Sequence, residues 1–174
     1  RAPAFTATLV LVLGLGMGAT TAIFTLVDGL ILRDLPVRSP DRLVYFSRPS
    51  FSYPIFTEVR ARSADVLESV AAWSVEDFHV AWGQELEPAE VLTASGGFYA
   101  TLGVTAAAGR TFSEDDDQIG GGPHGRVAVI SDAAWQRRYG GDPGAIGRTV
   151  RIGPDTYTIV GVTPRGYSGV APGI

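Results

Sequence analysis

The stretch Val12-Leu-Gly-Leu-Gly-Met-Gly-Ala-Thr-Thr-Ala-Ile-Phe24 (VLGLGMGATTAIF) decides how the first part of this chain folds. Gly14, Gly16 and Ala19 fit the G-x-G-x-x-G/A pattern of a dinucleotide-binding turn. Such a turn follows a strand and opens a helix that is apolar on one side only. No charged side chain occurs from Ala2 to Val27, so a helix here has no solvated face. This favours a membrane-spanning helix over a cofactor turn.

One helix from Phe5 to Val27 accounts for the stretch. At about 1.5 Å per residue it is roughly 34 Å long, enough to cross a hydrocarbon core of about 30 Å. Gly14, Gly18 and Ala22 then recur at every fourth position. Small residues at this spacing let a second helix pack closely within a membrane. We predict that these three residues form a helix-packing site.

A cleaved signal peptide is a further interpretation, with Arg1 as its basic end and Thr20-Thr-Ala22 as a small-residue cleavage site. The apolar region of a signal peptide has about 7 to 15 residues, and the run from Phe5 to Val27 is longer. Asp28 is the first charge after that run. We therefore expect an uncleaved helix that leaves the hydrocarbon at Asp28.

The amino-acid composition limits which partners and which kinds of catalysis the chain can have. The net charge of −4 argues against nucleic acid as a partner. No cysteine occurs, which excludes disulfides, thiolate catalysis and Cys-ligated zinc. All 14 basic side chains are Arg, and without Lys there is no Walker A motif and no Schiff-base chemistry. Any nucleotide hydrolysis on which the protein depends must come from another chain.

Three segments follow from these patterns: a transmembrane helix in residues 1–32, a connector in 33–42 with two prolines, and an ordinary-sized soluble domain in 43–174. The first residue is Arg, and the last residues follow a strand-like segment with no closing element. We therefore expect the chain to be a fragment.

Short strands and helices are mixed in the domain, which indicates an α+β fold. We expect the second and third strands to pair, and the last two to form a hairpin across Gly153-Pro-Asp155. Periodicity and capping signals predict strands at 43–46, 70–74, 78–82, 90–94, 127–130, 149–152 and 157–162, and helices at 52–62, 95–103 and 131–139.

The residues that could bind a metal ion are better explained by structural roles. His79 alternates away from an apolar strand face and has no partner at ligand spacing. The acidic run Glu114-Asp-Asp-Asp117 fails as an EF-hand loop, because Ile119 and Arg126 stand where ligands are required. We interpret Ser113 and Asp116 as a capping box before a glycine-rich surface loop.

Nucleophile motifs are also incomplete. Ser95 and Ser168 each lack one glycine of the G-x-S-x-G pattern. Arg137 and Arg138 resemble an anion site, but cations in the last turn of a helix are favoured by its exposed carbonyls. We therefore predict no catalytic, cofactor-binding or metal-binding residue, and no enzymatic activity.

Several phrases taken together resemble one family. They resemble the permease subunits of macrolide-exporter-type ABC systems, the MacB/FtsX-like group, and especially the large duplicated permeases common in acidobacteria. The phrases, in chain order, are Pro3-Ala-Phe-Thr6, Leu13-Gly-Leu-Gly-Met-Gly-Ala-Thr-Thr-Ala-Ile-Phe24, Leu30-Ile-Leu-Arg-Asp-Leu-Pro36, Pro40-Asp-Arg-Leu-Val44, Gly97-Phe-Tyr-Ala-Thr-Leu-Gly-Val104, Gly109-Arg-Thr-Phe112, Val127-Ala-Val-Ile-Ser131, Trp135-Gln-Arg-Arg-Tyr-Gly-Gly-Asp-Pro143 and Ile159-Val-Gly-Val162.

The resemblance implies a short cytoplasmic stub, the first membrane helix and the N-terminal part of a periplasmic core domain. It implies an inner-membrane permease subunit without cofactors, driven by a cytoplasmic ABC ATPase, whose periplasmic domain carries the movement outward in efflux or mechanotransmission. A periplasmic adaptor and a homodimer partner are also implied. Arg33, Arg38 and Arg42 flank the outer end of the helix, against the positive-inside rule, but large domains translocate largely regardless of charge.

Two rival functions stay open at this point. A singly anchored extracytoplasmic binding module without transport shares the helix and the domain. A dinucleotide-binding oxidoreductase predicts that NAD or NADP protects the protein from heating.

Overall fold

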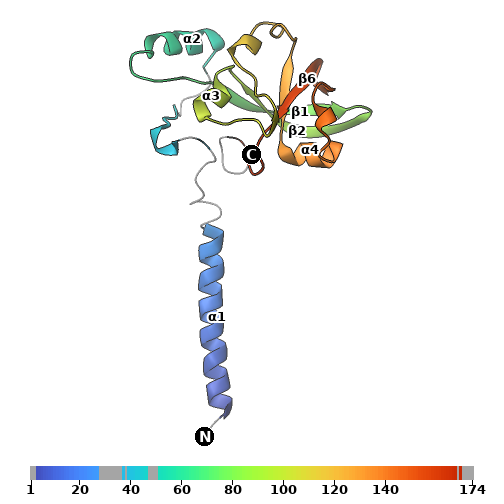
Figure 1. Ribbon diagram of the computed structural model, residues 1–174. Coiled ribbons are helices and arrows are strands. Elements are labelled where there is room, and N and C mark those ends of the chain that lie inside the picture. The colour runs from blue at the N-terminus through green and yellow to red at the C-terminus, as the bar shows by residue number, and fades with distance from the viewer. Residues whose placement is uncertain (1–2, 28–36, 38, 47–50, 168, 170–174) are drawn as a thin grey trace. The chain divides into compact units, whose positions relative to one another are not determined.

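The computed structural model describes residues 3–27, 37, 39–46, 51–167 and 169. The chain divides into two units, Arg1–Leu35 and Pro36–Ile174, which we describe separately (Figure 1). Asp28, where we expect the helix to leave the hydrocarbon, and residues 33–36 and 38 of the predicted connector lie outside the described residues.

The first unit contains one helix, α1 (Pro3–Val27). Its 25 residues are helical without interruption, which confirms the helix predicted from Phe5 to Val27. The segment from Gly14 to Ala19 lies inside this helix, so no strand precedes it and no turn interrupts it. The dinucleotide-turn interpretation of these glycines is therefore wrong.

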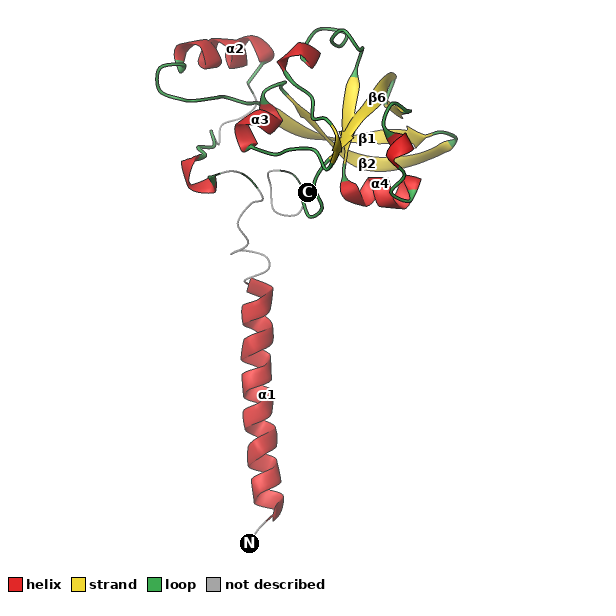
Figure 2. Ribbon diagram, in the orientation of Figure 1, coloured by secondary structure: helices red, strands yellow, loops and turns green. Residues whose placement is uncertain are grey.

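The second unit is built on one mixed sheet of six strands (Figure 2). The hydrogen-bonded order is β2-β1-β5-β6-β3, with every one of these pairs antiparallel, and β4 pairs in parallel with β6. The strands are β1 (Trp73–Trp82), β2 (Glu85–Ala94), β3 (Ala108–Gly109), β4 (Val127–Ile130), β5 (Thr149–Ile152) and β6 (Asp155–Val162).

Three short α-helices accompany the sheet, and they confirm the predicted helices to within a few residues. They are α2 (Tyr53–Arg62), α3 (Phe98–Leu102) and α4 (Asp132–Tyr139). The Ser131 hydroxyl accepts from the Ala134 N–H at 3.1 Å and caps α4. Gly103 (φ 67°) and Gly140 (φ 60°) end α3 and α4 in the left-handed conformation that glycine adopts without strain.

Two hydrophobic cores lie on opposite faces of the sheet. The first core consists of Val80, Ile130, Val150, Ile159 and Val162, with Trp135 and Tyr139 of α4 packed against it. The second core consists of Phe98, Tyr99, Leu102, Val104 and Tyr167, with Trp73 and Val129 packed against it. Since successive residues of a strand face opposite sides, β1 sends Val80 to one core and Trp73 to the other.

A bulge in β6 makes the first core possible. Ala128 of β4 pairs with Ile159, but the next residue, Val129, pairs with Gly161, so Val160 is skipped. The extra residue shifts by one position the alternation of β6 side chains between the two faces of the sheet. Ile159 and Val162, which would face opposite sides of a regular strand, therefore both reach the first core, where each is fully buried.

The domain also corrects two strand predictions. The strands predicted at 70–74 and 78–82 are not a pair. A single strand, β1, begins at Trp73, continues unbroken to Trp82 and pairs with β2, while residues 70–72 are not in a strand. Glu76 and Asp77, which resemble a break, lie on opposite faces of β1 and are both exposed. The true turn is Gly83-Gln84, and β2 begins at Glu85 rather than Glu90, because Pro88 is tolerated in a strand at the sheet edge.

The strand predicted at 43–46 does not form. These four residues have no regular structure, and they make no backbone hydrogen bond to another described residue. Tyr45 instead stacks on Trp73, with ring centroids 6.1 Å apart. Aromatic and β-branched residues favour a strand only where a neighbouring strand accepts them.

Candidate functional site

The structure shows where the candidate metal-binding and nucleophilic residues of the sequence lie. No group of three or more His, Asp or Glu side chains within them is placed to hold a metal ion. His79 and His124 are exposed, and Ser95 is buried, with its hydroxyl accepting from the Ala72 N–H at 3.0 Å. Ser168 lies outside the described residues. The features that carry functional information are therefore α1 and the polar contacts that hold the domain together.

Helix α1 has the length and composition of a membrane-spanning helix. Its segment Thr6–Thr25 is long and apolar enough to cross a membrane, with a mean hydropathy of 1.9. Hydroxyl groups would be costly there, but three are satisfied within the helix. Thr20, Thr21 and Thr25 donate to the carbonyls four residues earlier, at 2.8 to 2.9 Å.

The predicted packing residues occupy open positions on α1. Among the described residues, no atom outside the helix's own neighbouring backbone lies within 4 Å of a Cβ added at Gly14 or Gly18. Ala22 follows one turn later and is exposed. Their role in packing against another helix stays a prediction.

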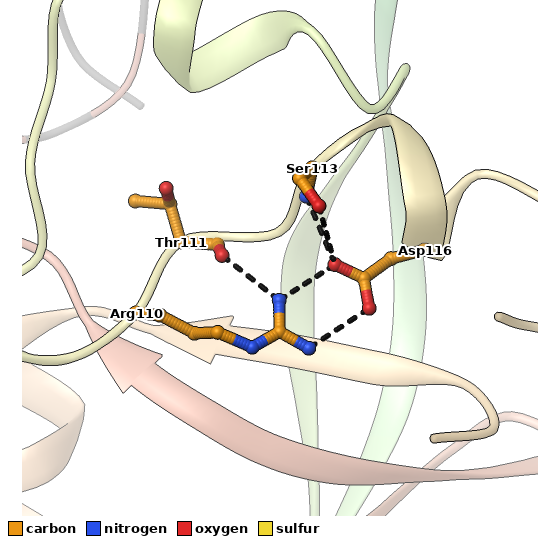
Figure 3. A network of polar contacts seen from close by, with 4 residues as sticks. All are labelled: Arg110, Thr111, Ser113 and Asp116. Atoms are coloured by element: carbon orange, nitrogen blue, oxygen red, sulfur yellow. Dashed lines mark hydrogen bonds and ion pairs between the residues drawn. The ribbon is translucent and has the colours of Figure 1, made fainter. Parts of the chain in front are cut away.

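The acidic run of the domain forms a polar brace (Figure 3). Arg110 follows β3 and donates to both carboxylate oxygens of Asp116, from Nη1 at 2.6 Å and from Nη2 at 2.9 Å. Asp116 Oδ2 also accepts from the Ser113 N–H at 2.9 Å, which confirms the predicted capping box. The Asp116 side chain is only 5% exposed. These contacts close the loop onto the end of β3.

The electrostatics of the brace follow from this geometry. The Arg110 guanidinium lowers the pKa of Asp116 below its ordinary value, and the Ser113 backbone N–H acts in the same direction. Burial of the carboxylate acts against both. Asp116 is thus held ionised as the acceptor of a bidentate pair.

The neighbouring acids have partners of their own. Asp117 accepts from the Gly96 N–H at 2.9 Å, and Glu114 pairs with Arg60 of α2 at 2.9 Å. The loop approaches Gly96 so closely that an added Cβ would lie 2.5 Å from the Ser113 carbonyl oxygen. The run therefore joins α2, the segment before α3 and the end of β3. Pattern analysis missed the contacts with Arg60 and Gly96, because these partners are 54 and 21 residues away.

The structure separates the two arginines at the end of α4. Arg137 is exposed, and no described residue pairs with it. Arg138 reaches β2, where its guanidinium pairs with both Glu85 and Glu87. The sequence predicted only the favourable position at the helix end, since the two carboxylates are more than fifty residues away.

Comparison with known proteins places these features in context. The profile of the MacB-like periplasmic core domain matches residues 6–173. The extracellular domain of the noncanonic ABC-type transporter YknZ from Gram-positive bacteria is 20% identical, with a TM-score of 0.56, over 67% of this chain and 58% of that one. The periplasmic region of MacB from Actinobacillus actinomycetemcomitans is 17% identical, with a TM-score of 0.52, over 62% of this chain and 49% of that one.

These likenesses are of fold. The chain spans about half of the solved domains that it matches. No curated protein matches it.

Proposed function

Because the chain belongs to the family of MacB-like periplasmic core domains, we propose that it acts in the permease subunit of an ABC transporter, where its extracytoplasmic domain relays ATPase-driven movement across the inner membrane. The observation that carries the proposal is the extent of the family match, which takes in both the apolar helix and the domain. A helix and a domain that occur together can pass a movement from one to the other.

The chain has the parts that such a relay needs and lacks those of a motor. Without Lys these 174 residues contain no Walker A motif, so the ATP hydrolysis that drives the movement lies outside them. The domain is braced by ion pairs and two cores, which suits a body that transmits displacement. A domain that transmits displacement serves efflux and mechanotransmission alike. A periplasmic adaptor or a second copy of this chain would receive the movement.

Α cysteine scan tests the topology on which this proposal depends. Single cysteines from Ala7 to Arg48 are introduced into the cysteine-free chain, and labelling by an impermeant maleimide is measured in whole cells. We expect no labelling from Ala7 to Val27 and labelling from Asp28 onward. Absence of labelling from Asp28 to Arg48 in whole cells, with labelling of the same positions after the cells are permeabilised, would place the domain in the cytoplasm and reject the proposal.

A second experiment tests the coupling. Leu86 is 59% exposed, so a Leu86→Cys variant can be labelled with a maleimide. Its labelling rate is measured while the cytoplasmic ATPase binds and hydrolyses ATP. We expect its labelling rate to change with ATP and to stay constant with an ATPase that cannot bind nucleotide. Identical rates in all states would favour the singly anchored binding module over the transporter.

A further inference from the structure

The tip of the β1–β2 hairpin is held to the rest of the sheet by a short junction. The hairpin itself is regular from Trp73 opposite Ala94 to Trp82 opposite Glu85. Its backbone meets β5 only where Val80 and Ala81 pair with Ile152 and Arg151, next to the bond from the Gly153 N–H to the His79 carbonyl at 3.0 Å. These contacts lie beside the tip on the β1 side, where Val80 is buried in the first core and Trp82 packs against it. On the other side, β2 is the edge strand and, among the described strands, pairs only with β1.

A polar cluster fastens the same tip to α4. Arg138 donates to Glu85 from Nη1 and to Glu87 from Nη2. Its guanidinium carbon lies 6.0 Å from the centroid of the Trp82 ring. Trp82 in turn donates from Nε1 to Glu87 Oε1 at 2.8 Å, and its ring meets Tyr139 edge-on at 6.1 Å. Helix and hairpin thus share one hydrogen-bonded cluster over the first core.

The charges make Arg138 the centre of this cluster. Glu85 and Glu87 lie on the same face of β2, so they repel each other unless a cation stands between them. Arg138 is 18% exposed and Glu87 is 28% exposed, whereas Glu85 is 74% exposed. The pair with Glu87 is therefore less screened by water than the pair with Glu85 and contributes more.

We propose that Arg138 is a latch, which locks α4 to the tip of the β1–β2 hairpin so that the two move as one body. Without the guanidinium, the two carboxylates repel and Glu87 keeps only the Trp82 N–H. The β2 side of the tip then loses its ion pairs to α4 and can move away from the helix, while Val80 and Trp82 keep β1 on the first core. This inference rests on the geometry of the domain alone and holds whether or not the protein is a transporter.

Spin-label distance measurements on the full chain in detergent test the latch. One label pair, at Leu86→Cys and Ala133→Cys, spans the hairpin tip and α4, and both positions are exposed. A second pair, at Ala133→Cys and Thr156→Cys, spans α4 and β6 and monitors the fold. The native chain has no cysteine, so each pair is labelled alone.

We expect Arg138→Met to broaden the distance distribution of the Leu86–Ala133 pair at least about twofold, with the Ala133–Thr156 pair unchanged. Glu87→Gln should broaden the first pair in the same way, and Glu85→Gln should broaden it less. Arg137→Met is the matched control, because it removes the adjacent exposed arginine, and it should change neither pair.

The proposal is overturned if Arg138→Met and Glu87→Gln both leave the Leu86–Ala133 distribution as narrow as in the native chain. It is also overturned if both variants broaden the two label pairs alike, since the cluster would then support the whole fold and not the hairpin tip. Where Arg138→Met does not fold, the result with Glu87→Gln decides.

Discussion

At the scale of single residues, the acidic run Glu114–Asp117 shows how a pattern typical of cation binding serves as structure. Three of its four carboxylates have partners within the domain: Arg60 for Glu114, Arg110 for Asp116 and the Gly96 N–H for Asp117. Only Asp115 makes no such contact to a described residue. Two of the four negative charges are thus paired with arginines of the domain.

Asp116 makes the stability of the domain depend on pH. Its pKa is lowered in the folded state, so its contribution is complete above the pKa of the unfolded chain and is lost as the pH falls toward the folded value. We expect Asp116→Asn to lower the free energy of unfolding at pH 7 by about 1–3 kcal/mol. Urea denaturation from pH 7 to pH 3 measures both effects.

The difference in stability between the native chain and Asp116→Asn should shrink as the pH falls below about 5, because the native carboxylate then becomes protonated. Asp115→Asn is the control, since Asp115 is exposed, and it should change stability little at any pH. A difference between the native chain and Asp116→Asn that stays constant across this range would contradict the assigned role.

Gly96 provides a steric prediction. Its added Cβ would lie 2.5 Å from the Ser113 carbonyl oxygen and 2.6 Å from the Glu114 Cα, both of which are main-chain atoms that cannot turn aside. We expect Gly96→Ala to cost about 1–3 kcal/mol of unfolding free energy. Thermal and urea denaturation of the full chain measure this loss.

The adjacent Gly97 is the matched control. An added Cβ there would meet only Glu114 Oε1, at 2.7 Å, and the end of a flexible side chain can move away. Gly97→Ala should therefore change stability by no more than about 0.5 kcal/mol. Equal losses for Gly96→Ala and Gly97→Ala would show that the close approach of the loop is not the cause.

At the scale of elements, α1 presents two sets of glycines that differ in their place around the helix. Gly14, Gly18 and Ala22 follow one another at four-residue intervals on one face, whereas Gly16 lies on the opposite face. If the first set packs against another helix, only that face is sensitive to bulk. The two sets therefore serve as test and control within one helix.

We expect Gly18→Leu to weaken helix association in the membrane at least about tenfold, which corresponds to about 1.4 kcal/mol. Cross-linking by a photoreactive label on Thr25→Cys, in membranes that contain the partner proteins, measures the associated fraction. Gly16→Leu adds the same bulk to the opposite face and should leave the cross-linked fraction unchanged. Equal losses for both variants would argue against a packing face at Gly14, Gly18 and Ala22.

At the scale of the whole molecule, the chain is organised so that α1 contributes nothing to the cores of the domain. Every residue of both cores lies in Pro36–Ile174. The second unit thus has hydrophobic cores of its own.

We expect residues 36–174, expressed without the helix, to stay in solution without detergent and to unfold in one cooperative transition. The midpoint of thermal unfolding should match that of the domain in the full chain, because no core residue has been removed. Calorimetry of both proteins makes the comparison. Aggregation of the shortened chain, or a midpoint more than about 8 °C lower, would show that the helix stabilises the domain.

The sequence alone determined the elements that depend on local signals. The absence of charge from Ala2 to Val27 fixes an apolar helix, because no other structure satisfies so many backbone groups in lipid. Ser131 and Gly140 define α4, and Gly153-Pro154 turns the chain between β5 and β6. These signals act over a few residues, so they are visible without the fold.

The tertiary structure alone decided which strands have neighbours and which charges have partners. Leu43–Phe46 has the composition of a strand but no described strand beside it, whereas β1 continues through Glu76 and Asp77 because β2 pairs with it throughout. Arg138 meets its carboxylates only once the hairpin lies against α4. Strand pairing and ion pairing join residues far apart in sequence, and no local pattern records those distances.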